Sequence, residues 1–289
     1  MSKYESPLVS IIIPNYNYGQ YIAEAIDSAL NQTYQPVEVI VVDDGSTDNS
    51  RDIINSYGQT IKAIFQTNHG PSVARNAGIA ISKGDYIIFL DADDVLLPDA
   101  AQHLWQGFLA DPQCGVIFGT AVLIDTHSNF TAMHTNEVRY FSYEEFLFKN
   151  YILTPEAMVK KEILNEIGYF NPNILQCEDY DLWLRIAQKN VIKHIDKTVV
   201  QVQKHAASFS ANTIRLLTWE RYVILYHANQ SCLSRRAVAD VCHRLAYQCR
   251  IVRQTKLFRQ YTIESIKYNP LYWKNYAYLL YSWFMQLQP

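Results

Sequence analysis

The chain has no paired or regularly spaced cysteines. No two of its five cysteines form a C-x-x-C pair. An odd, unpatterned set is typical of reduced thiols in a cytosolic protein rather than of a disulfide framework. The five are Cys114, Cys177, Cys232, Cys242 and Cys249.

Long apolar runs are also missing. The N-terminus has no apolar segment of the kind found in signal peptides. No run of about 18 uncharged apolar residues, the length that would span a bilayer, is present either. We therefore expect a cytoplasmic protein that meets a membrane, if at all, only peripherally at its inner face.

An excess of basic residues is absent as well. The 25 Lys and Arg against 28 Asp and Glu give a formal charge of -3, which argues against a nucleic-acid-binding protein. No G-x-G-x-x-G follows the first predicted strand, and no G-x-x-x-x-G-K-S/T occurs, so the nicotinamide, flavin and P-loop fingerprints are excluded. At 289 residues and 49% hydrophobic, the chain suits one large domain or a domain with an appendage.

A repeated strand–loop–helix pattern fills the first hundred residues. Apolar runs, several rich in β-branched residues, occur at 9–13, 37–42, 61–65 and 86–90. Between them, apolar residues recur at helical spacing. This alternation predicts an α/β fold in which a mostly parallel central sheet is flanked by helices.

Acidic residues follow two of these strands directly. Asp43 and Asp44 end the second strand, and Asp91, Asp93 and Asp94 end the fourth. Ligands of parallel α/β sheets bind at the carboxyl ends of the strands. Asp91 and Asp93 would point the same way in an extended segment, which suits Mg²⁺ or Mn²⁺ bridging to phosphate oxygens. The alternative is a solvated acidic turn before the next helix.

The second half of the chain is less regular. A polar loop or hairpin is expected at 125–137, short strands at 192–195 and 199–202, and only helices from about residue 213. Residues 271–284 are rich in Trp and Tyr, which favour membrane interfaces. The alternative is a helix packed on the main domain or on a second copy of the chain. The few Lys and Arg in this segment favour packing.

Five motifs occur in a fixed order. They are VSIIIPNYN at 9–17, VDDGSTD at 42–48, ARNAG at 74–78, LDADD at 90–94 and EDYDLW at 178–183. The ordered set resembles the family 2 glycosyltransferases, inverting enzymes of the GT-A fold, over roughly residues 7–210. The resemblance implies a catalytic domain at 1–210, with a nucleotide-sugar half to about 110 and an acceptor half beyond it. Residues 211–289 would form a C-terminal helical region.

The resemblance also implies a reaction. A sugar would pass from a nucleotide-diphosphate donor, expected to be a UDP-sugar, to a hydroxyl of a glycan or lipid-linked acceptor, with inversion. Asp179 would be the catalytic base. Asp93 would bind Mn²⁺ or Mg²⁺, and His205 would be a further metal ligand or a diphosphate contact. The nucleotide-binding residues implied are Pro14, Tyr16, Asp43, Asp44, Arg75 and Asp91.

Each assignment has a plainer alternative. Asp179 could be a helix N-cap, Arg75 a solvated helix arginine, and His205 a strand-end histidine without a ligand. A nucleotidyltransferase would also combine a parallel sheet with metal-binding carboxylates. It usually needs a basic, glycine-rich loop after the first strand, whereas residues 15–19 contain no basic residue. A non-catalytic nucleotide-sugar-binding protein is the third alternative, although both a candidate base and a candidate metal ligand are present.

Overall fold

A computed structural model describes residues 6–124, 130–132, 137–203, 213–230, 235–251, 254–271 and 273–286. The chain forms two compact units. The first comprises Met1–Tyr143 with Tyr151–Ser208, and the second comprises Glu144–Asn150 with Phe209–Pro289. The two units are described separately.

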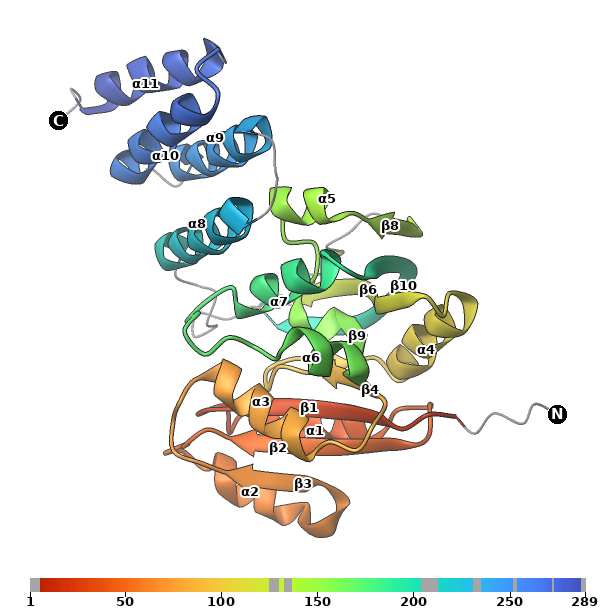
Figure 1. Ribbon diagram of the computed structural model, residues 1–289. Coiled ribbons are helices and arrows are strands. Elements are labelled where there is room, and N and C mark those ends of the chain that lie inside the picture. The colour runs from red at the N-terminus through yellow and green to blue at the C-terminus, as the bar shows by residue number, and fades with distance from the viewer. Residues whose placement is uncertain are drawn as a thin grey trace. The chain divides into compact units, whose positions relative to one another are not determined.

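The N-terminal part of the first unit is a parallel sheet in the order β3-β2-β1-β4 (Figure 1). Its strands are β1 (Val9–Asn15), β2 (Val37–Asp43), β3 (Lys62–Phe65) and β4 (Tyr86–Phe89). The connecting helices are α1 (Ile22–Leu30), α2 (Ser50–Ser56) and α3 (Pro71–Ile81). The predicted parallel arrangement is therefore confirmed for this part of the chain.

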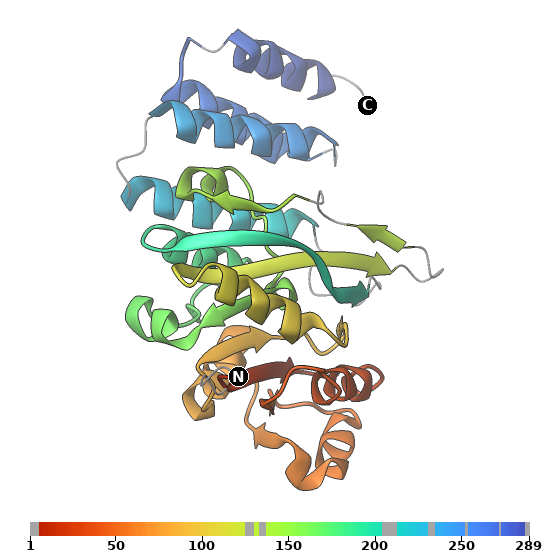
Figure 2. The ribbon, with the colours of Figure 1, turned by 90° about the vertical axis from the view of Figure 1, so that its right-hand side faces the viewer.

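The rest of this sheet is mixed, because β9 (Ala157–Lys160) is antiparallel to both β4 and β6 (Cys114–Ile124). β10 (Val191–Gln203) runs parallel beside β6 as one long strand with register shifts, where two short strands were expected (Figure 2). The remaining elements are β5 (Val95–Leu96), α4 (Ala100–Ala110), β7 (Phe130–Ala132), β8 (Arg139–Phe141), α6 (Lys161–Ile167) and α7 (Glu178–Ala187). Much of the loop expected at 125–137 lies outside the described residues.

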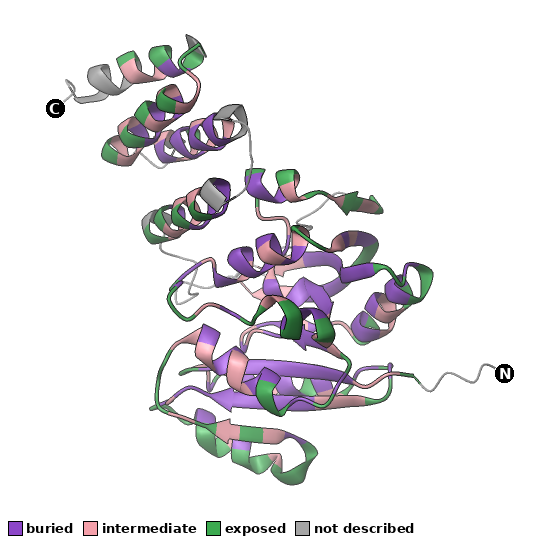
Figure 3. Ribbon diagram, in the orientation of Figure 1, coloured by how far each residue is buried: buried purple, intermediate pink, exposed green. Residues whose placement is uncertain are grey.

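The centre of the sheet is fully apolar, and Figure 3 shows β1 and β2 buried over most of their length. Ile11, Ile13, Val41 and Ile88 have no exposed surface. Each such side chain stabilises the fold by about 1.5–3 kcal/mol. The packed apolar core of the sheet therefore holds in place the strand ends that carry polar residues.

Helix α3 packs closely on the sheet at Gly78. A Cβ atom at Gly78 would lie 2.4 Å from Cγ2 of Ile12 in β1. Only a residue without a side chain allows this approach. Because Arg75 lies one turn earlier on α3, the close packing also fixes the position of its side chain.

We expect Gly78→Val to destabilise the first unit by roughly 1–3 kcal/mol, because the new side chain would overpack against Ile12. Thermal unfolding should show a Tm lower by several degrees. Ala80→Val, at an exposed position on the same helix, is the matched control and should cost only the small helix-propensity difference. Equal Tm values for the two variants would contradict the close approach.

The second unit is helical. It contains α8 (Thr213–Gln230), α9 (Arg235–Ile251), α10 (Thr255–Tyr268), α11 (Trp273–Gln286) and most of α5 (Tyr143–Phe148). Asn275 of α11 is fully buried and makes 2.7 Å hydrogen bonds to His243 of α9 and Ser265 of α10. One face of the Trp- and Tyr-rich helix therefore packs within its own unit. None of the described helices is both long and apolar enough to cross a membrane.

Candidate functional site

The loops that follow β1 and β2 are joined by side-chain hydrogen bonds at the carboxyl edge of the sheet. The Asn15 amide donates to Asp43 at 3.0 Å and to Ser46 Oγ at 3.1 Å. The same Oγ accepts the backbone N–H of Asn17 at 2.9 Å. These bonds hold the two loops in one arrangement.

Asp43 lies beneath this edge, with no exposed surface. Burial alone would raise the pKa of Asp43, but hydrogen bonds from Ser46, Arg51 and Asn15 outweigh it and hold the pKa below its usual value. Both carboxylate oxygens bond to these neighbours. The geometry thus favours a bracing role for Asp43 rather than the direct nucleotide contact that the resemblance implied.

Asp44 is also buried and ties the β2 loop to the segment before α3. Its carboxylate accepts hydrogen bonds from Gln66 Nε2 at 2.6 Å and from the backbone N–H groups of His69 and Gly70 at 3.0 and 2.7 Å. A nucleotide base bound here would therefore contact a carboxylate that these hydrogen bonds already hold in place. Nucleotide contact by Asp44 stays a prediction.

The end of β1 offers a different kind of surface. Pro14 is half-buried, whereas 45% of Tyr16 is exposed. An exposed aromatic ring at a ligand edge can stack on a planar base. This placement is compatible with the predicted base pocket.

Arg75 joins the acidic motif after β4 to the acidic motif of α7. Its Nη2 donates to Asp91 Oδ1 and its Nη1 to Glu178 Oε1, both at 2.7 Å. Burial works against the charge of Arg75, but the two carboxylates outweigh it and raise its pKa. Arg75 is 5% exposed, so it is not the solvated arginine considered as an alternative.

A second connection reinforces the first. Asn76, next to Arg75, donates to the backbone oxygen of Phe170 at 2.9 Å and accepts its N–H at 3.0 Å. The Arg75 guanidinium also lies 5.3 Å from the centre of the Phe170 ring. Two neighbouring residues of α3 thus hold the segment that leads into α7.

Asp179 is the second residue of α7 and is not its N-cap. Cys177 occupies the N-cap position, has φ of 62° and makes no side-chain cap bond. The Asp179 carboxylate accepts the N–H of Tyr180 at 2.7 Å. The N-cap alternative is therefore wrong, and the first turn of the helix favours a negative charge at this position.

Two residues in the motif-bearing segments have an uncommon backbone conformation. Among the described residues, Asn17 and Cys177 are the non-glycine residues with positive φ, at 60° and 62°. Such conformations are uncommon outside glycine and concentrate at functional sites. One lies in the loop after β1 and the other at the start of α7.

Three carboxylates crowd together after β4. Burial, followed by the charges of Asp91 and Asp93, raises the pKa of Asp94 well above its ordinary value. Its Oδ1 accepts the N–H of Gln203, the last described residue of β10, at 3.2 Å. Because the three acids repel one another, a cation here would lower the free energy of the folded state.

Tyr18 is a candidate site residue that the motifs did not identify. Burial, followed by the charges of Asp93, Asp91 and Asp94, raises the pKa of its phenol. Its hydroxyl group therefore lies within the field of the acidic cluster. The available signal was its place in the polar, aromatic loop after the first strand.

The described residues alone do not supply a complete set of metal ligands. Among the described residues, no group of three or more His, Cys, Asp and Glu side chains could hold a metal ion. The acidic cluster nevertheless has the hard oxygen atoms that Mg²⁺ and Mn²⁺ prefer. An ion there would need further oxygen ligands from phosphate or water. His205 lies outside the described residues.

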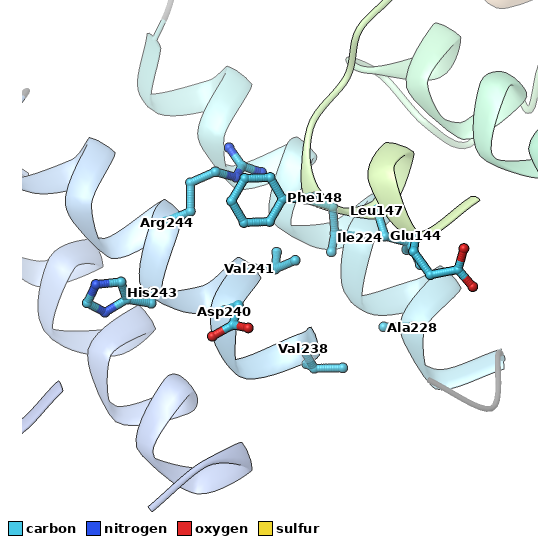
Figure 4. Close-up of a pocket in the computed structure, with 10 residues that line it drawn as sticks. All are labelled: Glu144, Leu147, Phe148, Ile224, Ala228, Val238, Asp240, Val241, His243 and Arg244. Atoms are coloured by element: carbon cyan, nitrogen blue, oxygen red, sulfur yellow. The ribbon is translucent and has the colours of Figure 1, made fainter. Parts of the chain in front are cut away.

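A cavity of about 380 Å³ lies elsewhere, within the second unit. Figure 4 shows its mainly apolar wall, formed by side chains of α5, α8 and α9, with Arg244 beside Phe148. None of the site residues predicted from the sequence lines it. The cavity is therefore separate from the candidate active site.

Comparisons with known proteins identify the family of this chain. The model of the family Glycosyl transferase family 2 matches residues 10–168. An uncharacterized glycosyltransferase of Rickettsia prowazekii is 34% identical over 73% of this chain and 69% of its own length. The chondroitin synthase of Pasteurella multocida is 33% identical over 81% of this chain, which spans only 24% of that enzyme.

Solved structures support the fold. A crystal structure of S. aureus TarS superposes with a TM-score of 0.66 at 20% identity, covering 91% of this chain and 81% of the other. A structure of TarS with UDP-GlcNAc gives a TM-score of 0.57 at 18% identity, covering 95% and 79%. The resemblance read from the five motifs is confirmed: this chain belongs to the family 2 glycosyltransferases and has the GT-A fold.

Proposed function

We propose that this glycosyltransferase moves a hexosyl or N-acetylhexosaminyl group from a UDP-sugar to a hydroxyl of a glycan or lipid-linked acceptor, with inversion. The observation that carries the proposal is the Arg75 bridge, since it brings the Glu178-Asp179 motif to the Asp91-Ala92-Asp93 motif. Support for the donor comes from TarS structures with UDP and with UDP-GlcNAc. The names of two relatives, a chondroitin synthase and a hyaluronan synthase, support a glycan acceptor.

The nucleotide would lie on the carboxyl edge of the parallel strands. Tyr16 would stack on the base, beside Pro14, and Asp44 would accept a hydrogen bond from uracil. Asp91, which is 33% exposed, has surface left for the ribose. Arg75 would position Asp91 and α7 rather than touch the nucleotide, because its guanidinium is already engaged.

Inverting transfer requires a base on the side of the sugar opposite the diphosphate. Asp179 is partly exposed at the start of α7, where a carboxylate can accept the proton of the acceptor hydroxyl as the new bond forms. Its negative charge would also stabilise the positive charge that develops on the sugar ring.

The leaving diphosphate gains negative charge as the sugar departs. A bound Mn²⁺ or Mg²⁺ would supply Lewis-acid stabilisation of that charge. Asp93 is the residue proposed to hold the ion, within the cluster completed by Asp91 and Asp94. Tyr18, whose hydroxyl lies in the field of the same cluster, is proposed to donate a hydrogen bond to a phosphate oxygen.

Thermal unfolding with UDP tests the donor and the metal together. We expect UDP with Mn²⁺ to raise Tm, and UDP with EDTA to raise it much less. At a ligand concentration of roughly 100 times Kd, the stabilisation should be about 2.7 kcal/mol. ADP, GDP and CDP with Mn²⁺ serve as base controls.

Asp93→Asn should remove most of the metal-dependent shift. Asp85→Asn, an exposed aspartate just before the other end of β4, is the matched control and should behave as wild type. An equal shift with and without metal would exclude the proposed role of Asp93. Stabilisation by another nucleoside diphosphate in place of UDP would exclude the proposed donor.

A further inference from the structure

The charge of the chain is divided very unevenly. Residues 209–289 contain eleven Lys and Arg but three Asp and Glu, in a chain whose formal charge is -3. No acidic residue follows Glu264. The charge balance of the whole chain argued against a nucleic-acid-binding protein, but residues 209–289 are strongly basic. Such asymmetry between parts of a chain points to an anionic surface or polymer.

Helix α10 presents part of this charge on one stripe. Lys256, Gln260, Ile263 and Lys267 are all exposed and recur at helical spacing. The opposite side of the helix is buried, with Phe258 and Tyr261 at its centre. Glu264, the one acid of α10, is paired with Arg221 of α8 and so does not neutralise the stripe.

The turn between α10 and α11 places exposed apolar surface next in the chain to the exposed lysines of α10. Leu271 is 92% exposed and stands between Lys267 and Lys274 in the sequence. On α11, Tyr276 and Leu280 are 44% and 64% exposed. Figure 3 shows exposed residues on both helices. The buried Asn275 fixes the orientation of α11 and leaves these side chains outside.

We propose that the α10–α11 hairpin docks the protein on an anionic lipid surface. Lysines near a membrane are attracted to acidic headgroups, and apolar side chains beside them enter the boundary with the acyl chains. The low number of cations within residues 271–284 is offset by the lysines of α10. Nucleic acid would account for the lysines but would leave Leu271 and Leu280 without a role. The proposal does not depend on the sugar-transfer reaction.

Vesicle co-sedimentation of the full-length protein tests this docking. One set of vesicles is phosphatidylcholine alone, and the other contains about 30% phosphatidylglycerol, in about 0.1 M salt. We expect binding to the acidic vesicles, release at high salt, and little binding to the neutral ones. The variant Lys267→Gln/Leu271→Ser/Lys274→Gln should bind the acidic vesicles at least about tenfold more weakly.

A matched control variant replaces two exposed lysines and one exposed leucine of the first unit instead. Lys83, Leu109 and Lys197 are all exposed there. Lys83→Gln/Leu109→Ser/Lys197→Gln should bind as wild type does, although its net charge equals that of the hairpin variant. Failure of the wild type to bind acidic vesicles would overturn the proposal, as would equal losses in the two variants. Binding to duplex DNA without binding to vesicles would also overturn it.

Discussion

Replacement of Asp179 by Asn is expected to abolish sugar transfer while leaving donor binding nearly unchanged. The amide keeps the shape of the side chain and can still accept the Tyr180 N–H, so α7 should begin as before. What is lost is the carboxylate that takes the acceptor proton. Loss of a general base lowers a rate by roughly 10²–10⁴-fold. Loss of the charge next to the forming cationic sugar should place this variant at the upper end of that range.

Three measurements separate the roles of Asp179. Transfer is followed by UDP release with acceptor present, donor affinity by calorimetry, and folding by Tm. Asp196→Asn, at an exposed position on β10, is the control and should match wild type in all three. Weak donor binding by Asp179→Asn would mean that this residue holds the nucleotide sugar instead of activating the acceptor. Undiminished transfer would favour another base.

The parallel half of the sheet and its acidic edge were predictable because their signals are local. Strand β4 is apolar and ends in a run of acids, and both facts can be read within ten residues. The separate roles of the adjacent residues Asp43 and Asp44 could not be predicted in this way. Both side chains are buried, and their different hydrogen-bond partners cannot be inferred from two adjacent aspartates in the sequence. Asp43 is bonded to Asn15 and Arg51, whereas Asp44 is bonded to Gln66 and to the backbone before α3.

Long-range pairing accounts for what the sequence did not predict. Strand β9 is four residues long, and its antiparallel place between β4 and β6 depends on contacts with distant segments. The ion pair between Arg75 and Glu178 joins residues 103 positions apart. Each belongs to a recognisable motif, but no spacing rule links them. The connection between the donor motif and the motif of the proposed base is therefore a result of the structure.

Replacement of Arg75 by Met is expected to cost both stability and activity. The substitution preserves much of the apolar volume but leaves Glu178, whose side chain is 8% exposed, without its cation. Removal of one partner of a buried ion pair typically costs about 3–5 kcal/mol. Arg75→Lys should recover only part of the loss, because a single ammonium group cannot reproduce the two-pronged contact with Asp91 and Glu178. Lys189→Met, which breaks an exposed pair with Glu166, should cost at most about 1 kcal/mol.

A double-mutant cycle distinguishes positioning by Arg75 from simple stabilisation. In the Arg75→Met background, Glu178→Gln should recover stability, because it removes the uncompensated charge, whereas alone it should destabilise. Transfer should stay low in the double variant even when assayed well below its Tm, since the direct bridge between the Asp91 motif and the Glu178-Asp179 motif is then missing. Additive stability effects would exclude the coupling across the bridge. Recovery of full transfer in the double variant would show that the bridge stabilises the fold without positioning the base.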